Sequence, residues 1–408
     1  MSSAIEIDVD SPAGAAAALR STRAVRGRAR FLTERARAGE SPWFTVHAEA
    51  LEPAAALVAE VTRSNYPDLQ IPFHSRWRHF EAAGVDRRTA FLSAADPRAL
   101  VDLTVVSVLL DAGAGASWSY REPRTGLRLS RSEGLGVASF HAFTAGLFSS
   151  DPADPLRVDA AGLAGLTAGR LSAAFQNDAA NPLVGLDGRL AILGRLGVTL
   201  SAAPQAFGAD GRPAGLLDTV PRQGGNTVRA HDILTTILTA LAPIWPSGNM
   251  IGEESLGDCW RHRALRGPGL TAGWMPFHKL SQWLTYSLLE PFGWAGIAVT
   301  DLDELTGLPE YRNGGLLLDT GVLRLRDATS STRNVTAADE LVVEWRALTV
   351  ALLDELAPLV REQLGVDAEQ LPLARVLEGG TWAAGRLLAQ QLRGGLPPLS
   401  IASDGTVF

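Results

Sequence analysis

The sequence is poor in cysteine and lysine: it has a single cysteine, and Lys279 is the only lysine among its 37 basic residues. One cysteine excludes an intramolecular disulfide framework and fits a reducing compartment, so we expect a cytoplasmic protein. Long apolar runs are also absent. The longest, such as residues 105–110, are too short to span a bilayer, and the polar residues 1–12 lack the apolar segment of a secretory signal. We therefore expect no membrane contact.

An excess of basic charge is missing as well. The formal net charge is −7, which argues against a broad nucleic-acid-binding face because the neutralisation of phosphates requires a basic surface. It leaves open a local basic pocket. An apolar content of 46% with 20% charged residues is typical of a globular protein, and 408 residues can bury a large core. We expect a small molecule as the partner, and nothing in the composition fixes the oligomeric state.

The patterns that are present predict a mainly α fold with a few short strands. Residues 97–111 are apolar nearly all round, which indicates a buried core helix that ends at the glycines of residues 113–115. Short strands are expected at 118–128 and 315–325. Periodicity predicts the other helices at 53–63, 133–148, 160–175, 189–196, 228–241, 277–291, 338–364 and 382–392.

Signals for separate domains are weak, because no long flexible or charged tether divides the chain. We expect residues 1–45 to form a partly helical N-terminal extension and residues 46–408 to form a single helical domain. Within the extension, the arginine-rich residues 20–37 predict a solvated helix. A transit peptide is the alternative, which Glu34 disfavours.

Four clusters carry candidate site residues, and the first is IPFHSRWRHF at residues 71–80. His74, Arg76 and Arg78 are suited to bind a phosphate or a carboxylate, with His74 and Arg78 at i,i+4 of a helix. The alternative is a set of aromatic anchors with the arginines paired to surface acids. The sequence leaves both interpretations open.

The second cluster is LDAGAGASWSYR at residues 110–121. Asp111 lies at the C-terminal end of the predicted buried helix, where the helix dipole disfavours a carboxylate by about 0.3–1 kcal/mol. Asp111 therefore needs donors, and Trp118 follows the glycines, so both are candidates for substrate binding. An Asx turn that ends the helix is the alternative. The glycines do not form a dinucleotide-binding motif because no strand precedes them, and we expect no cofactor.

The third cluster includes PFHKLSQWLTY at residues 276–286. On a helix, His278 and Gln282 share one face, and Lys279 and Trp283 lie on the adjacent face, as in a pocket wall. Because arginine replaces lysine everywhere else, Lys279 is a candidate for a role that needs a compact ammonium, although chance retention is a serious alternative. An amphipathic helix with an extended surface lysine would look the same.

The same cluster includes GEESLGDCWRH at residues 252–262, in which Asp258 and Trp260 are candidates. Asp258 and His262 would share a helical face as metal ligands, but no established ligand spacing accompanies them, so we expect no metal. Cys259 has no base partner in the sequence and is interpreted as a buried filler.

The fourth cluster is LTGLPEYRNGGLLLD at residues 305–319. Here an acid, a phenol, a guanidinium and an amide precede a double glycine, and residues on such loops are often functional. A plain turn is the alternative. The candidate residues are Glu310, Tyr311, Arg312 and Asn313.

Taken together, motifs from residue 71 to the C-terminus resemble a fungal and bacterial family of uncharacterised domains in the non-reductive pathway of uracil catabolism. The resemblance rests on IPFHSRWRHF, DLTVVSVLLDAGAGASW, RSEGLGVASF, NPLVGLDGR, PFHKLSQWLTYSLLEP, LTGLPEYRNGGLLLDTGVL, VEWRALTVALLD, LEGGTW and SDGTVF.

LGDCW and LTGLPEYRNGG are also similar to two motifs of the queuosine-nucleotide salvage hydrolases, which cleave an N-glycosidic bond. That family has a helical fold related to DNA glycosylases, so the similarity implies a DNA-glycosylase-like helical core. Glu310 stands where that family typically has aspartate, and the following glycines also differ. The matching positions are Asp258, Trp260, Glu310, Tyr311 and Arg312.

The two resemblances imply a hydrolase for the N-glycosidic bond of a ribosylurea-type or pyrimidine ribonucleoside- or ribonucleotide-derived intermediate. Asp258 and Glu310 would be the carboxylate pair, with Asp111 in reserve, because cleavage builds positive charge on the sugar. His278 or Lys279 would assist the leaving nitrogen. Trp260 and Trp283 would stack on the leaving group, and a 5′-phosphate would be held by Arg76, Arg78 or Lys279.

Two alternatives remain open. One is a hydrolase of a C–N bond in the opened pyrimidine ring, although such a reaction usually uses a metal or an activated nucleophile. The other is a non-catalytic subunit that binds a ligand or serves as a scaffold for the pathway.

Overall fold

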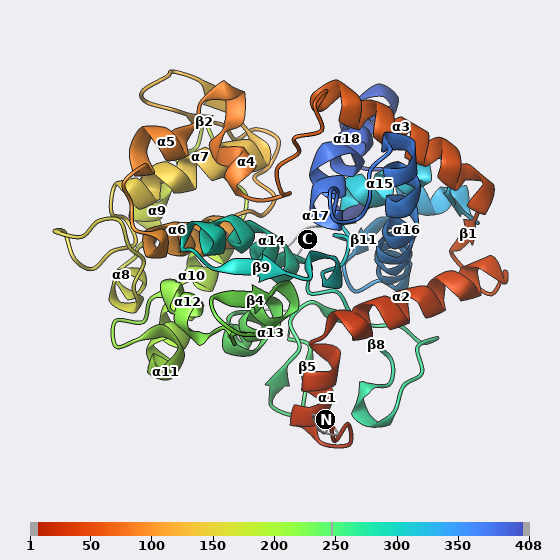
Figure 1. The fold of residues 1–408 in the computed structure, drawn as a ribbon, viewed down its shortest axis with the longest axis horizontal. Coiled ribbons are helices and arrows are strands. Elements are labelled where there is room, and N and C mark those ends of the chain that lie inside the picture. The colour runs from red at the N-terminus through yellow and green to blue at the C-terminus, as the bar shows by residue number, and fades with distance from the viewer. Residues whose placement is uncertain (1–6, 246–247, 403–408) are drawn as a thin grey trace. The chain divides into compact units, whose positions relative to one another are not determined.

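The computed structural model describes residues 7–245 and 248–402, so the SDGTVF motif lies outside the described residues. The fold is mainly α-helical with short strands, as predicted (Figure 1). Contacts divide the described chain into two compact units. Unit 1 comprises residues 7–74, 248–282 and 301–402, and unit 2 comprises residues 75–245 and 283–300. The predicted boundary at residue 45 and the likeness to DNA glycosylases stay predictions.

Unit 1 is organised around α16 (Glu340–Leu364), which packs against α2 (Thr22–Arg37) and α3 (Leu51–Asn65). Residues 341–353 of α16 are all buried, and each large apolar side chain removed from water contributes about 1.5–3 kcal/mol. α15 (Tyr311–Asp319) packs against α18 (Trp382–Arg393) and α16. The other helices of unit 1 are α1 (Pro12–Leu19), η1 (Ala48–Ala50), η5 (Gly269–Thr271), the first turn of α14 (Lys279–Trp294), η6 (Leu302–Glu304), η7 (Ala328–Thr332) and α17 (Leu373–Val376).

A π-helical turn, η8 (Leu377–Thr381), joins α17 to α18. Its glycines permit close packing on α3: a Cβ at Gly380 would lie 2.4 Å from Thr62 Oγ1 and 2.6 Å from the Val58 carbonyl oxygen. π-helical turns occur frequently at functional sites. This one places Glu378 beside His74, whose Nδ1 lies 2.7 Å from the carboxylate.

Unit 2 is centred on α6 (Pro97–Leu109), which is buried from Ala99 onward, as its apolar sequence predicted. It packs against α7 (Arg131–Thr144) and α10 (Leu186–Ala202). Arg189 of α10 donates hydrogen bonds to the carbonyls of Leu110, Ala112 and Gly113, which follow the C-terminal end of α6. The other helices are α4 (Trp77–Phe80), η2 (Ala82–Gly84), α5 (Arg87–Leu92), α8 (Ala160–Ala164), α9 (Ala168–Ala174), α11 (Pro204–Phe207), η3 (Pro213–Gly215), α12 (Leu216–Thr219), α13 (Ala230–Ala240), η4 (Ala242–Ile244) and the rest of α14.

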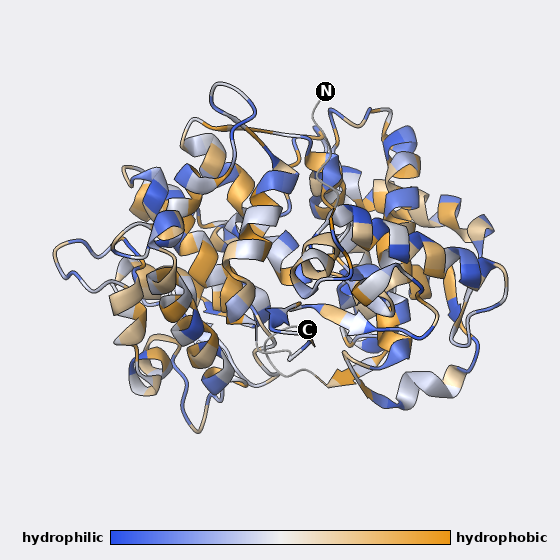
Figure 2. Cartoon of the chain, turned by 90° about the horizontal axis from the view of Figure 1, so that it is seen from below, coloured by the Kyte–Doolittle hydropathy of each residue, from blue (hydrophilic) through white to orange (hydrophobic). Residues whose placement is uncertain are grey.

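Most helices carry both hydrophilic and hydrophobic residues, as expected of helices with one face toward a core (Figure 2).

The described strands are short and pair two by two. The pairs in unit 1 are β1 (Phe44–Val46) with β10 (Leu323–Leu325), β5 (Met250–Ile251) with β6 (Glu254–Ser255) and β7 (Cys259–Arg261) with β8 (Trp274–Pro276), all antiparallel, and β11 (Asn334–Thr336) with β12 (Ser400–Ala402), parallel. Those in unit 2 are β2 (Tyr120–Arg121) with β3 (Arg128–Leu129), antiparallel, and β4 (Thr227–Arg229) with β9 (Ala298–Thr300), parallel.

Some local predictions were wrong. The predicted strand at 315–325 is helical up to Asp319, because the Glu310 side chain caps α15, and only Leu323–Leu325 is extended. The predicted helix at 160–175 is split into α8 and α9, because Thr167 caps the second helix. His74 precedes α4 and pairs with Glu378, so it shares no helical face with Arg78.

A buried carboxylate in unit 2 gives a prediction on pH dependence. Glu122 accepts hydrogen bonds from Arg87, His141 and Thr125 at 2.6–2.7 Å. Burial raises the pKa of Glu122, but these donors outweigh it and lower the pKa to about 2. The folded-state pKa of Glu122 lies below its ordinary value of 4.5. The stabilisation that ionised Glu122 gives to the folded state is therefore complete above pH 4.5 and is lost as the pH falls toward 2.

We therefore expect the free energies of unfolding of the wild type and Glu122→Gln to differ most above pH 4.5 and to converge toward pH 2. Urea denaturation of both proteins across this range measures the difference. A difference in the free energy of unfolding that stays constant between pH 5 and pH 3 would contradict the lowered pKa of Glu122.

Candidate functional site

Asp258 and Arg346 form a buried ion pair in unit 1. Asp258 precedes β7 and Arg346 lies on α16, and two parallel hydrogen bonds of 2.8 and 2.7 Å join the guanidinium to the carboxylate. Trp260 Nε1 and the backbone N–H of Lys279 donate to the same carboxylate at 2.7 and 2.9 Å. Each carboxylate oxygen thus accepts two hydrogen bonds. Asp258 and His262 lie at the two ends of a strand, so the helical face proposed for a metal pair does not exist.

Burial raises the pKa of Asp258, but the charge of Arg346 and the hydrogen bonds outweigh it, and the pKa is lowered overall. The guanidinium of Arg346 also lies 4.0 Å from the centre of the Phe277 ring. Asp258 is 9% exposed and Arg346 is 1% exposed. Asp258 is therefore a fixed anion that orients its neighbours rather than a base with a free lone pair.

Glu310 is the second predicted carboxylate, and it caps the N-terminus of α15. Its oxygens accept hydrogen bonds from the backbone N–H groups of Arg312 and Asn313 at 2.9 and 2.5 Å. Glu310 is only partly buried. Arg346 Nε donates to the carbonyl of Pro309 at 3.4 Å, so one guanidinium connects Asp258 with the residue before Glu310. The structure thus links Asp258 through Arg346 to the backbone carbonyl of the residue that precedes Glu310.

Tyr311 and Trp382, both half-buried, form an aromatic and cationic cluster with Arg312, which is 6% exposed. The guanidinium of Arg312 lies 4.0 Å from the centre of the Trp382 ring, and its Nε donates to the Tyr311 hydroxyl at 3.0 Å. The His74 ring lies 6.4 Å from the Trp382 ring. Tyr66 donates to Glu378, the partner of His74, at 3.3 Å. Motifs more than 300 residues apart in the sequence, such as those of His74 and Glu378, therefore meet in unit 1.

His278 immediately precedes α14, and its side chain is buried and hydrogen-bonded to the backbone. It is 3% exposed, and its Nε2 lies 3.0 Å from the Leu19 carbonyl oxygen, so Nε2 carries the proton and donates it there. Burial lowers the pKa of His278. Its φ of +51° is a left-handed conformation that favours glycine, and its N–H donates to the Asp258 carbonyl. Its assistance to a leaving group stays a prediction.

In unit 2 the first and second clusters meet. Arg76 is fully buried, and its Nη1 lies 2.9 Å from Asp111 Oδ2, while its Nε donates to Ser107 at 2.8 Å. Burial lowers the pKa of Arg76, although Asp111 opposes that shift. Arg78 pairs with Glu81 and Glu290. Both arginines are therefore matched by carboxylates, and phosphate binding by them stays a prediction.

The remaining predicted residues make hydrogen bonds or ring contacts within the protein. Gln282 is fully buried and exchanges hydrogen bonds with Thr306. Asn313 is fully buried and donates to the Leu308 carbonyl. Trp118 is 1% exposed and donates to a backbone carbonyl, and Trp283 makes an edge-on contact with His79 at 6.1 Å.

Sequence reasoning did not single out Arg346, Glu378 or Trp382 as site residues. The available signals were local: Arg346 is a basic residue inside the apolar run VEWRALTVALLD, and Glu378 and Trp382 flank the double glycine of LEGGTW. A charged residue in the buried stretch of a helix needs a buried partner. That partner is far away in the sequence.

Comparison with known proteins places the chain in a family. Residues 18–408 match the family described as a protein of unknown function, DUF1688, and the chain belongs to it. It is 38% identical over 409 residues to Protein urg3 of Schizosaccharomyces pombe, covering 96% of this chain and 98% of that protein. It is 39% identical over 377 residues to Uracil catabolism protein 4 of Lachancea kluyveri, covering 83% and 85%. The predicted family is thus confirmed.

Two further findings concern the described residues only. None of their helices combines the length and the apolar character that a membrane crossing requires. Their histidine, cysteine, aspartate and glutamate side chains form no group of three or more suited to a metal ion.

Proposed function

We propose that this protein acts in uracil catabolism by hydrolysing the N-glycosidic bond of a ribosylurea-type or pyrimidine ribonucleoside- or ribonucleotide-derived intermediate. The observation that carries the proposal is the network in which Arg346 holds Asp258 and the backbone beside Glu310. The partly exposed Glu310 carboxylate is held by the backbone N–H groups of Arg312 and Asn313, and the Arg312 side chain contacts Tyr311 and Trp382. The name of the Lachancea kluyveri relative supports the pathway.

Glu310 is the group assigned to the reacting sugar. Loss of the leaving nitrogen builds positive charge on the ribose ring, and a fixed carboxylate stabilises that charge without reorganising. The two backbone N–H groups of α15 hold the Glu310 oxygens, and each oxygen retains a lone pair for an incoming water or for the sugar. Asp258 is assigned a positioning role, through Arg346 and Pro309.

Arg312 and the aromatic rings are assigned to the leaving group. A ureido or pyrimidine group is planar and carries carbonyl oxygens, which a guanidinium binds with parallel N–H groups. The Arg312 guanidinium lies on the Trp382 ring, which restricts its orientation. Lys279 is assigned the compact ammonium for a phosphate or for the leaving nitrogen, and its backbone N–H binds the Asp258 carboxylate.

Incubation of the purified protein with ribosylurea, its 5′-phosphate, uridine and uridine monophosphate tests the reaction. We expect at least one of them to release a reducing sugar together with urea or uracil. Ammonia or carbon dioxide released with the ribose still attached would indicate cleavage of the opened ring instead. No turnover of any of the four substrates would remove the proposal.

A further inference from the structure

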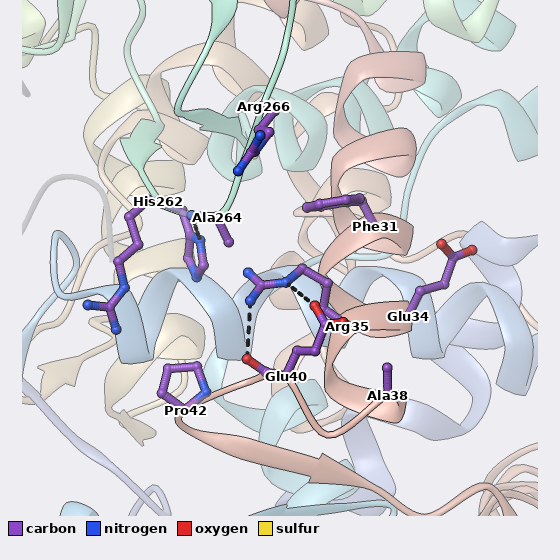
Figure 3. A pocket seen from close by; sticks show the side chains of 10 residues that line it. Phe31, Glu34, Arg35, Ala38, Glu40, Pro42, His262, Ala264 and Arg266 are labelled. Carbon is purple, nitrogen blue, oxygen red and sulfur yellow. Dashed lines mark hydrogen bonds and ion pairs between the residues drawn. The ribbon is translucent and has the colours of Figure 1, made fainter.

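Unit 1 contains a pocket of about 730 Å³, apart from the Asp258 and Glu310 network. It lies between the C-terminal half of α2 with the loop that follows it and the segment after β7. No residue of the network lines it (Figure 3). The volume is in the range of small-molecule sites, roughly 300–1,000 Å³. The lining residues are Phe31, Glu34, Arg35, Ala38, Glu40, Pro42, His262, Arg263, Ala264 and Arg266.

The pocket carries cationic groups with unused N–H donors. Arg266 is exposed and forms no ion pair or hydrogen bond with any described residue. Arg35 is fixed through Nε to the Glu40 carboxylate at 3.1 Å and through Nη2 to its carbonyl, which leaves Nη1 available. In Figure 3 the guanidinium groups of Arg35 and Arg266 point into the space between them, whereas the Glu34 carboxylate points away.

Phe31 supplies an apolar part of the wall, and His262 supplies a fixed part. Phe31 is 39% exposed, which is high for a large apolar side chain, and its ring borders the same space (Figure 3). His262 is 2% exposed, and its Nδ1 accepts a hydrogen bond from the Ala264 N–H while its Nε2 donates to Glu344 at 3.1 Å. The Ser41 hydroxyl donates to the other oxygen of Glu344. The histidine side of the pocket is therefore fixed in place.

We propose that this pocket binds a nucleoside monophosphate, with the phosphate between Arg35 and Arg266 and the base against Phe31. Arginine binds phosphate oxygens with parallel N–H groups, and an exposed aromatic ring stacks on a base of any kind. The pocket offers two guanidinium groups on one side and an apolar ring on the other, which matches a ligand with a charged end and a planar end. The site is independent of the function proposed for Glu310.

Isothermal titration calorimetry of the full chain with adenosine monophosphate, adenosine and inorganic phosphate tests this proposal. A purine nucleotide is chosen because it is not a substrate of the proposed reaction. We expect adenosine monophosphate to bind at least about tenfold more tightly than adenosine, because adenosine lacks the charge-assisted hydrogen bonds. Arg266→Ala should weaken its binding by a factor of about ten or more.

Two further variants separate the contributions. Phe31→Ala should weaken the binding of adenosine monophosphate at least about fivefold and leave the binding of inorganic phosphate unchanged, because only the base stacks on the ring. Arg23→Ala, which removes an exposed arginine from the same helix α2 but outside the pocket, should leave both ligands unchanged. The proposal is overturned if adenosine monophosphate does not bind, if adenosine binds equally well, or if Arg266→Ala and Arg23→Ala behave alike.

Discussion

Replacement of Glu310 by glutamine is expected to lower kcat by about 10²–10³-fold on whichever ribosyl substrate is turned over, with a small change in KM. The amide has nearly the same shape as the carboxylate and its oxygen can still cap α15. It lacks the negative charge that the oxocarbenium-like transition state requires. Because that charge matters mainly in the transition state, kcat should fall much more than substrate binding weakens. Initial rates of reducing-sugar release over a range of substrate concentrations measure both constants.

The structural role of Glu310 needs its own control, because loss of a helix cap costs about 0.5–2 kcal/mol. Asp86 is the matched residue: it caps α5 by accepting a hydrogen bond from the Thr89 N–H. Asp86→Asn makes the same change from acid to amide at a cap in unit 2. We expect it to retain full activity. Wild-type turnover by Glu310→Gln would show that the carboxylate is not required.

Asp258→Asn should reduce the free energy of unfolding by about 3–5 kcal/mol, because it leaves the buried Arg346 without a compensating charge. The amide also places N–H donors against the guanidinium or the indole N–H of Trp260. Urea denaturation monitored by circular dichroism measures the loss. Glu355→Gln on the same helix α16 breaks an ion pair whose side chains are 36% and 37% exposed, and it should cost only about 0.2–1 kcal/mol.

A double replacement tests whether the instability of Asp258→Asn comes from the unpaired charge of Arg346 or from a change in side-chain packing. Asp258→Leu together with Arg346→Met removes both charges, and it should recover much of the stability lost by Asp258→Asn. Catalysis should not recover, since the Pro309 carbonyl would no longer be held by Arg346 Nε. A double variant as unstable as Asp258→Asn would contradict the role of the unpaired charge.

Local features of this fold were predictable, because periodicity and caps act within a few residues. α6 and α16 follow directly from apolar runs, and α6 begins at a proline behind the cap of Asp96. The helix α15 was missed because LLL after a double glycine resembles a strand. Its helical state depends on the cap by Glu310, whose polar neighbours are typical of a loop.

The candidate site was predictable only in part, for a different physical reason. Asp258, Glu310 and Arg312 came from motifs, but their functional geometry depends on partners that are distant in sequence. Arg346 lies 88 residues after Asp258. No periodic pattern encodes such a pairing, because it results from how α16 packs against β7 and α15. Likewise, the approach of η8 to α3, which brings Glu378 to His74, depends on glycines that sequence reasoning treats as turns.

Unit 1 is built from segments near both ends of the chain, which has a consequence during translation. Arg26 on α2 is joined to Asp354 on α16 by an ion pair that spans 328 residues. At the translation rates of cells, roughly 20–60 s separate the appearance of these two residues. During that time the apolar faces of α2 and α3 have no α16 to cover them. A nascent chain that stops before α16 is therefore expected to be a target for chaperones, and a C-terminal truncation within α16 should yield insoluble protein rather than a smaller folded domain.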